Sequence, residues 1–259
     1  MLKENSTNLV HGFINVYKPL GLTSMNVVRQ IKRLTGLRKR VGHGGTLDPL
    51  AEGVLPVCLG QATRLMTYLI EGGKEYEMDI RLGITTTTYD AEGEVVDSQE
   101  VSSISDSLIT RTMKSFEGTI YQTPPMYSAL KVNGQRLYKL ARSGIEIPRE
   151  PRVVEIPKIE IISFNSPDLK LRVECKRGVY MRSLGHDIGQ KLGCGAYVTR
   201  LVRSRAGPFR SVDSIEIDTL NEKSDNAVWK THLSKKSATS SLKAGCRASI
   251  HVSSGTAVR

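Results

Sequence analysis

The chain concentrates glycine, proline and acidic residues in one segment, Val41-Gly42-His43-Gly44-Gly45-Thr46-Leu47-Asp48-Pro49-Leu50-Ala51-Glu52-Gly53-Val54-Leu55-Pro56. The glycines let the backbone approach other groups closely, and Pro49 disfavours the helical conformation for the residue before it. Asp48 is therefore expected on a stiff, non-helical loop. An Asp-Pro pair taken alone most often marks a turn in which the aspartate binds its own backbone.

Apolar residues at every second position predict strands with one buried face. One run comprises Tyr76, Met78, Ile80, Leu82 and Ile84, and a shorter one comprises Leu171, Val173 and Cys175. Helices are expected after Ser24, across 105–116, at 135–142 and at 183–192. Because strands and helices are interleaved irregularly, we predict a mixed α+β fold rather than a regular βαβ array.

The charge balance favours an acidic partner. The chain has 259 residues, with 37 Lys and Arg against 26 Asp and Glu, for a net charge of +11. Nucleic acid is the commonest partner of such a protein. Two basic groups stand out: Arg29, Lys32, Arg33, Arg38, Lys39 and Arg40 before the Asp48 segment, and Lys131, Arg136, Lys139, Arg142, Arg149 and Arg152 further on. A solvated charged surface is the alternative for each residue taken separately.

Several classes of protein are disfavoured by the same sequence. No apolar run approaches the roughly 18 to 20 residues of a membrane span, and the polar N-terminus lacks the apolar region of a secretory signal. A cytoplasmic setting is therefore expected. The cysteines form no Cys-x-x-Cys pair, so reduced thiols are expected at Cys58, Cys175, Cys194 and Cys246. The glycine-rich loops lack Walker spacing, and we expect neither a metal nor a nucleotide cofactor.

The segment 44–51, continued by Gly53-Val54-Leu55 and Gly60-Gln61-Ala62-Thr63-Arg64, resembles the catalytic signature of the TruB family of tRNA pseudouridine synthases. Further segments agree in order: 15–19 with 21–24, 74–76, 124–131, 134–138 with 141–144, 178–184 and 193–196. The resemblance implies the pseudouridine synthase fold, a mixed and mostly antiparallel sheet flanked by helices and loops around a catalytic cleft. It also implies an isomerase that converts uridine to pseudouridine in the T-loop of tRNA, at the position numbered 55.

The resemblance assigns catalytic roles to three residues. Asp48 matches the aspartate that attacks the target uridine, so that the base detaches, rotates and rejoins the ribose through carbon 5. Arg182 matches the arginine that pairs with this aspartate, and a nearby positive charge keeps a carboxylate ionised. Tyr76 matches the tyrosine that stacks on the uracil. The alternatives are a surface arginine and an ordinary core tyrosine.

The resemblance also assigns substrate-binding residues. His43 matches a residue that contacts the RNA where the target base is flipped out. Tyr180 and Leu201 match pocket residues around the base. Lys18, and Lys131 and Arg142 of an RNA-clamping insertion at about 123–152, complete the predicted contacts. A structural histidine and ordinary core positions are the alternatives for the first three.

The predicted organisation is a catalytic domain over residues 1–215 and a short basic segment over 216–259. Six residues of that segment resemble the entry to an RNA-binding module called the PUA domain: Asp225, Ala227, Val228, Leu233, Leu242 and Gly245. The segment is therefore either a basic tail or a truncated remnant of the module. The expected partner is the T-arm of tRNA, bound by a monomer.

Three other functions are weighed against this one. The first is a guide-RNA-dependent pseudouridine synthase of the same family, and the second is an RNA-binding or RNA-folding factor with secondary catalysis. The third is serine acyl transfer, because Ser128-Ala129-Leu130-Lys131 fits a Ser-x-x-Lys motif. Short motifs of this kind often match by chance.

Overall fold

The structure of the chain is a computed structural model, which describes residues 10–101, 104–132, 134–222 and 233–234. The chain forms two compact units. Unit 1 comprises Met1–Pro49, Gly53–Gly72 and Arg205–Arg259, and unit 2 comprises Leu50–Glu52 and Gly73–Ser204.

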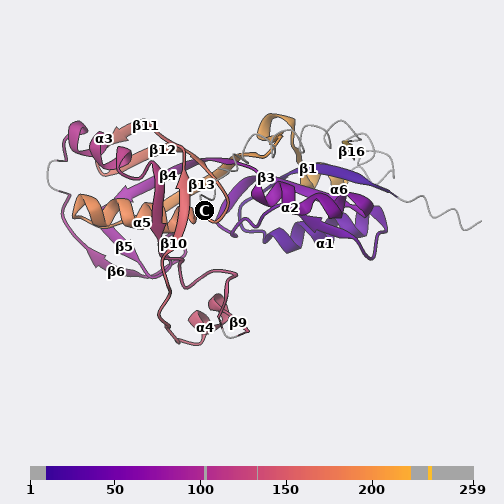
Figure 1. The fold of residues 1–259 in the computed structure, drawn as a ribbon, viewed down its shortest axis with the longest axis horizontal. Helices are drawn as coiled ribbons and strands as arrows, with labels where there is room; N and C mark the ends of the chain where they lie inside the picture. Colours follow the sequence, from indigo (N-terminus) through magenta and orange to yellow (C-terminus); the bar gives the residue numbers. More distant parts are fainter. Residues whose placement is uncertain (1–9, 102–103, 133, 223–232, 235–259) are drawn as a thin grey trace, which may run out of the picture. The chain divides into compact units, whose positions relative to one another are not determined.

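Unit 1 is built around strand β1 (Gly12–Lys18), which pairs antiparallel with β3 (Ala51–Leu59) and parallel with β15 (Ile215–Glu216). Short strands complete the pairing: β2 (Val41–His43) on β3, β14 (Phe209–Arg210) on Arg205 and Ala206, and β16 (Leu233–Ser234) on β1. The helical segments are α1 (Ser24–Thr35), η1 (Gly60–Leu65), α2 (Met66–Glu71), η2 (Ser211–Asp213) and α6 (Ile217–Glu222). Figure 1 shows α1 and α2 beside β1 and β3.

The sequence around α1 explains where this helix begins and ends. Thr23 is the N-cap, and its hydroxyl accepts a hydrogen bond from the Asn26 N–H at 3.1 Å. Gly36 ends the helix in the left-handed conformation, at φ 70°, which a glycine adopts without steric cost. Val28 and Ile31 lie on the apolar face of the helix and are buried. The helix expected after Ser24 is thus confirmed.

The core of unit 1 lies beside the same strands. It contains Phe13, Val54, Cys58, Ala62, Leu69, Ala206 and Phe209. The rings of Phe13 and Phe209 lie 5.7 Å apart between centroids, within the range of favourable aromatic pairs. Leu65 and Met66 pack against this cluster, so that η1 and α2 are attached to the sheet.

Unit 2 contains a sheet in the order β11 (Lys158–Asn165), β12 (Asp168–Cys175), β4 (Lys74–Leu82) and β13 (Ala196–Ala206). Strand β12 is antiparallel to both β11 and β4. Helices α3 (Asp106–Lys114) and α5 (Met181–Leu192) contact each other, and α5 also contacts β4 (Figure 1).

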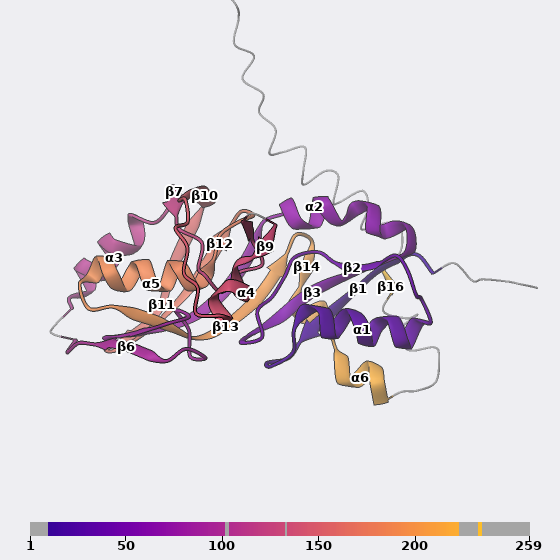
Figure 2. The same cartoon turned by 90° about the horizontal axis from the view of Figure 1, so that it is seen from below.

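Three two-stranded ribbons complete unit 2. They are β7 (Gly118–Gln122) with β10 (Arg152–Ile156), β5 (Ile84–Thr86) with β6 (Val95–Ser98), and β8 (Lys131–Val132) with β9 (Gln135–Arg136). Helix α4 (Leu137–Arg142) follows β9. The segment between β7 and β10 is the predicted insertion, and these two strands form its base (Figure 2).

The structure confirms the predicted α+β class and most of the expected elements. The strand expected to continue to Ile84 is interrupted at Gly83, which has φ 88°. A Cβ atom there would lie 2.7 Å from Val101 Cγ2 and 2.8 Å from the Gln99 carbonyl oxygen. The chain therefore bends at Gly83, and Ile84 begins the separate strand β5.

The end of the chain is described only in part. Ile215, Ile217 and Leu220 are buried in unit 1. Leu233 pairs with Ile14 of β1, whereas the other residues that resemble a PUA domain, and Cys246, lie outside the described residues. The predicted boundary at residue 215 stays a prediction. No helix in the described ranges is long and apolar enough to cross a membrane.

Candidate active site

The loop that carries Asp48 is held on both sides of the aspartate. Ser24 Oγ accepts a hydrogen bond from the Leu47 N–H at 2.8 Å and lies 3.0 Å from the Leu47 carbonyl oxygen, to which it donates. The Pro49 carbonyl oxygen accepts a bond from the Gly21 N–H at 2.8 Å. Asp48 lies outside helices and strands and is half-buried, as expected for a residue before proline. Its position is therefore fixed by the turn that leads into α1.

Lys18 reinforces this loop from inside unit 1. Its side chain is fully buried, and its ammonium group donates to the carbonyl oxygens of Pro19 at 2.8 Å, Leu22 at 2.7 Å and Pro49 at 3.4 Å. A buried charge is tolerated only where hydrogen bonds replace its hydration shell. Lys18 thus joins the turn after β1 to the residue that follows Asp48.

Gly42 and Gly44, on either side of His43, allow α2 to pack closely against this segment. His43 is the last residue of β2, opposite Val57, and the next N–H, that of Gly44, donates to the Pro56 carbonyl oxygen at 2.8 Å. A Cβ atom on Gly44 would lie 2.8 Å from Leu69 Cβ, and one on Gly42 would lie 2.6 Å from Met66 Sδ. The close approach expected from the sequence is therefore made, in unit 1, by α2.

Arg182 is a buried arginine in the first turn of α5. Its side chain is 5% exposed, and its Nη1 atom lies 3.4 Å from Asp90 Oδ2. The same Nη1 donates to the Thr88 carbonyl oxygen at 3.1 Å, and Nη2 donates to the Tyr127 carbonyl oxygen at 2.7 Å. Arg182 is therefore not a surface arginine, and its guanidinium group has a defined orientation.

Asp90, which the sequence reasoning missed, is held in its own network. Its Oδ1 accepts hydrogen bonds from the Thr88 hydroxyl at 2.5 Å and from the Glu92 N–H at 3.0 Å. This leaves Oδ2 for Arg182. The only available signal was an aspartate in a Thr-rich turn before Gly93, which is too common a pattern to mark a site.

Tyr89 anchors the turn that contains Thr88 and Asp90 to α5. Tyr89 has φ 64°, an unusual backbone conformation for a residue other than glycine, and its ring stacks on His186 with centroids 3.9 Å apart. Burial lowers the pKa of His186, and burial raises the pKa of the neighbouring Asp187 from 3.8 to about 6. The turn and the helix of Arg182 are thus connected at three points, Thr88, Tyr89 and Asp90.

Tyr76 lies on the buried face of β4, as predicted. It is 7% exposed and pairs with Val173 of β12. On the other side of β4, Ser204 donates to the Glu75 carbonyl oxygen and Thr199 donates to that of Asp79, so β13 runs antiparallel to β4. Leu201, 4% exposed, lies in this paired stretch of β13. Tyr76 and Leu201 therefore belong to neighbouring strands of unit 2.

Two buried cations near Tyr76 were not predicted. Lys74 is 8% exposed and Arg203 is fully buried. Burial, together with the positive charge of Arg203, lowers the pKa of Lys74 to about 8. They were missed because a lysine or arginine at a strand position is usually solvated.

The two basic residues predicted in the insertion are exposed. Lys131 lies in β8 opposite Arg136 of β9. Arg142 ends α4, with its guanidinium carbon 5.6 Å from the centroid of the Tyr138 ring. Both side chains present positive charge to solvent from unit 2.

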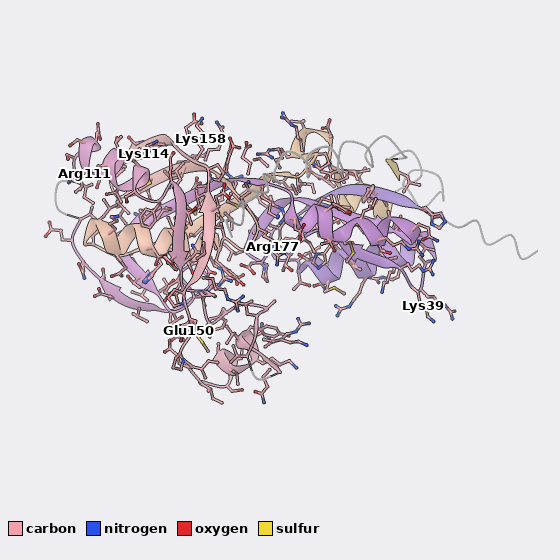
Figure 3. All side chains as sticks on the ribbon, in the orientation of Figure 1. Lys39, Arg111, Lys114, Glu150, Lys158 and Arg177 are labelled. Carbon is pink, nitrogen blue, oxygen red and sulfur yellow. The ribbon has the colours of Figure 1, made fainter. Side chains whose placement is uncertain are left out.

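Exposed basic residues of unit 1 lie on α1 and on the loop after it. Arg29, Arg33, Arg38, Lys39 and Arg40 are exposed, and Lys32 is half-buried. Figure 3 shows Lys39 pointing into solvent there. A further group, Arg111, Lys114 and Lys158, gathers around α3 and β11 in unit 2 (Figure 3). In that group Lys114 pairs with Glu117 and Lys158 with Glu160, so part of its charge is neutralised.

The predicted site residues divide between the units. Asp48, His43 and Lys18 belong to unit 1, and Tyr76, Tyr180, Arg182, Leu201, Lys131 and Arg142 belong to unit 2. Tyr180 is the residue that precedes α5, directly before the helix of Arg182. Of the acyl-transfer motif, Ser128 is buried whereas Lys131 is exposed, and no hydrogen bond joins their side chains in the described part of the chain.

Comparison with known proteins supports the same reading of the sequence. A family model described as TruB family pseudouridylate synthase (N terminal domain) matches residues 32–181. A second, described as tRNA pseudouridylate synthase B C-terminal domain, matches residues 182–243. The fold and these matches define a pseudouridylate synthase, an isomerase. Within that class, the chain belongs to the TruB family, as its sequence motifs predict.

Relatives are similar over most of the chain. The tRNA pseudouridine synthase B of Clostridium acetobutylicum is 51% identical over 211 residues, which are 82% of this chain and 72% of that protein. The protein of the same name from Dehalococcoides mccartyi is 48% identical over 209 residues, 81% of this chain and 69% of that protein. Among solved structures, a chain of a Cbf5-Nop10-Gar1 complex has a TM-score of 0.66 and 33% identity. The match covers 86% of this chain and 59% of that chain.

Proposed function

We propose that this pseudouridine synthase acts on tRNA and converts the uridine at position 55 of the T-loop. Relatives named tRNA pseudouridine synthase B are about half identical to this chain over four-fifths of its length. The structural observation that carries the proposal is the Asp48 loop, whose neighbours Leu47 and Pro49 are both hydrogen-bonded while the aspartate remains half-buried. A carboxylate held in this way is suited to attack a substrate without first reorganising.

The proposed reaction is an isomerisation with balanced bonds. The glycosidic bond between N1 of uracil and C1′ of ribose breaks, the base rotates, and a bond forms between C5 and C1′. The proton on C5 leaves and a proton is taken up at N1, so no oxidant or reductant is consumed. Asp48, as the ionised nucleophile, adds either to the ribose or to the uracil ring. No redox cofactor is required by this balance.

The other proposed roles follow the family resemblance. Arg182 is the catalytic arginine, Tyr76 stacks on the uracil, and Tyr180 and Leu201 line the base pocket. The burial of Arg182 argues against the surface arginine that was its alternative, whereas the burial of Tyr76 and Leu201 fits the wall of a base pocket and an ordinary core position equally. His43 contacts the RNA at the position of the flipped base. Lys18 was expected to contact the RNA, but its side chain is fully buried and its ammonium group binds three backbone carbonyl oxygens, so its proposed role is to hold the Asp48 loop in place.

Exposed cations supply the proposed affinity for RNA. Lys131 and Arg142 of the insertion, and the basic residues of α1 and the loop after it, are accessible to phosphates. Phosphate contacts position an RNA and carry no sequence information, so recognition depends on the folded shape of the T-arm. We propose that a monomer binds one T-arm in the cytoplasm.

The guide-RNA-dependent alternative has a specific observation in its favour. The solved structures with TM-scores of 0.62 to 0.66 include a Cbf5-Nop10-Gar1 complex and an H/ACA RNP bound to a substrate RNA. Their identity to this chain is 31% to 33%, compared with 51% for the tRNA pseudouridine synthase B of Clostridium acetobutylicum. The difference favours a stand-alone tRNA enzyme.

Release of tritium from tRNA labelled at carbon 5 of uridine tests the proposal. We expect the chain alone, without a guide RNA, to release tritium from a T-arm and not from a T-arm whose target uridine is replaced by cytidine. Asp48→Asn is expected to abolish release and to leave RNA binding in place. Binding without release by the parent chain would favour the RNA-binding or RNA-folding alternative. Release only with an added guide RNA would favour the ribonucleoprotein alternative.

A further inference from the structure

The end of β7 and the residues after it contact the beginning of α5 at three points. Gln122 binds the backbone of Tyr180, the carbonyl oxygen of Thr123 accepts a hydrogen bond from the Ser183 hydroxyl at 2.9 Å, and the carbonyl oxygen of Tyr127 accepts one from Arg182. The segment 122–127 therefore lies against residues 180–183, within unit 2. Arg182 lies in the middle of the stretch that is held.

Gln122 makes two of these bonds with one side chain. Its Oε1 accepts from the Tyr180 N–H at 2.7 Å, and its Nε2 donates to the Tyr180 carbonyl oxygen at 3.1 Å. Gln122 is 2% exposed, so water does not replace these bonds when they are lost. A primary amide satisfies both backbone groups of one residue at once, and the isosteric carboxylate and thioether side chains cannot.

These bonds fix the N-cap residue of a helix that has no side-chain cap. Tyr180 is the N-cap residue, and no side chain of its own caps the helix. Its carbonyl oxygen accepts the first helical bond, from the Leu184 N–H at 3.0 Å, as well as the bond from Gln122. The direction in which α5 leaves Tyr180 therefore depends on Gln122. Arg182 is two residues further on, in the first turn.

The guanidinium group of Arg182 depends on the same segment. Its Nη2 donates to the carbonyl oxygen of Tyr127, five residues after Gln122. The segment 122–127 thus holds both the backbone just before Arg182 and its guanidinium group. Displacement of a positioned catalytic group by about 1 Å is enough to cost about 100-fold in rate.

We infer that Gln122 is a positioning residue for catalysis, which sets the place of Arg182 by holding the backbone of Tyr180. The inference rests on the proposed catalytic role of Arg182. Gln122 itself is not expected to touch the substrate. Its loss is therefore expected to lower the rate of the chemical step and to leave the affinity for RNA unchanged.

Two substitutions of Gln122 remove its bonds in steps. Gln122→Glu keeps an acceptor for the Tyr180 N–H and loses the donor to the Tyr180 carbonyl oxygen, whereas Gln122→Met keeps the size and loses both bonds. We expect single-turnover tritium release at saturating tRNA to fall in the order parent, Gln122→Glu, Gln122→Met, the last by about 10- to 100-fold. The dissociation constant for tRNA is expected to stay within threefold. Gln190→Glu, at an exposed glutamine near the other end of α5, is the matched control and is expected to retain the parent rate.

A double-mutant cycle separates positioning from a general loss of structure. If Gln122 acts through Arg182, then Gln122→Met is expected to cost little further rate when Arg182 is already replaced in Arg182→Lys. Independent structural damage would instead multiply the two losses, and that result would overturn the inference. So would a parent-like rate of Gln122→Met, or equal losses of rate and RNA affinity.

Two further measurements keep the outcome decisive. Cooperative unfolding in denaturant shows whether Gln122→Met is folded. If it is not, Gln122→Glu and Ser183→Ala are used instead, the second of which removes the hydrogen bond to the Thr123 carbonyl oxygen. Parent-like rates in both variants would overturn the inference. Failure of the parent chain to release tritium would refute the proposed function rather than the role of Gln122. A fully active parent with unaffected Gln122 variants would refute the role of Gln122 alone.

Discussion

The Nη1 atom of Arg182 lies 3.4 Å from Oδ2 of Asp90, and both side chains are almost completely buried. Removing one partner of a buried ion pair leaves an uncompensated charge, which costs about 3 to 5 kcal/mol. Asp90 therefore fixes the orientation of Arg182 as well as balancing its charge. The carboxylate of Asp90 is itself oriented by Thr88 and Glu92.

Substitution of Asp90 by asparagine is expected to impair catalysis. Asp90→Asn keeps the shape and an oxygen for the Glu92 N–H, and it removes the negative charge that faces Arg182. We expect tritium release at saturating tRNA to fall at least tenfold, with the dissociation constant for tRNA changed less than threefold. Asp97→Asn, at an exposed aspartate of β6, is the control. An unchanged rate in Asp90→Asn would show that Arg182 is held well enough by Thr88 and Tyr127.

Replacement of Arg182 itself is expected to be more severe. Arg182→Ala removes the guanidinium group and leaves the carboxylate of Asp90 buried without its cation. We expect turnover to fall by more than 100-fold, while filter binding of tRNA is affected much less, because the side chain is too buried to contribute to phosphate binding. Losses of equal size in the two assays would contradict the catalytic assignment.

The packing of Gly44 against α2 predicts a change in stability. In Gly44→Ala the new methyl group would lie 2.8 Å from both Cβ and Cδ1 of Leu69, and a Cβ atom cannot move without its backbone. We expect the free energy of unfolding in denaturant to fall by about 1 to 3 kcal/mol, the usual cost of overpacking. In the double variant with Leu69→Ala, the loss is expected to be smaller than the sum of the two single losses. Because Leu69→Ala removes Cδ1 but keeps Cβ, additive losses would show that the contact with the Leu69 Cβ atom alone sets the cost.

The sequence predicts those parts of the fold that depend on local patterns. Alternation placed the strand of Tyr76, and the spacing of apolar residues after Ser24 placed α1, whose caps Thr23 and Gly36 were not predicted. The site was predictable only through the resemblance around Asp48 and Arg182. Gln122 and Asp90 were missed because their partners are distant in sequence, 58 residues away for Gln122 and Tyr180. A buried glutamine at a strand end has no local pattern that distinguishes it from a solvated one.

The exposed cations predict a steep dependence of RNA binding on salt. Each phosphate contact contributes a slope of about −0.7 to −0.9 in a plot of log affinity against log salt concentration. We expect Arg38→Gln combined with Lys39→Gln to reduce this slope by about 1 to 2 in filter-binding titrations. The control is Arg111→Gln combined with Lys114→Gln on α3, where Lys114 already pairs with Glu117, and it is expected to leave the slope unchanged. A parent slope close to zero would exclude the basic residues from RNA binding.

Burial of Asp187 predicts how stability changes with pH. Burial raises the pKa of this carboxyl group from 3.8 to about 6, so the folded chain binds its proton more tightly than the unfolded chain. The contribution of Asp187 to the free energy of unfolding is therefore fully present below pH 4, declines as the pH rises to about 6, and is constant above that. Because Asp187 is only half-buried, we expect solvent screening to limit the change to about 1 kcal/mol.

The variant Asp187→Asn isolates this contribution. Since His186 is present in both proteins, the opposite effect of its lowered pKa cancels to first order in the comparison. We expect the variant to gain stability relative to the parent as the pH rises from 4 to 6, measured by denaturant unfolding at a series of pH values. Asp213→Asn, at an exposed aspartate, controls for the loss of one negative charge. A difference between Asp187→Asn and the parent that does not vary with pH would mean that the carboxyl group is as well solvated in the folded chain as in the unfolded one.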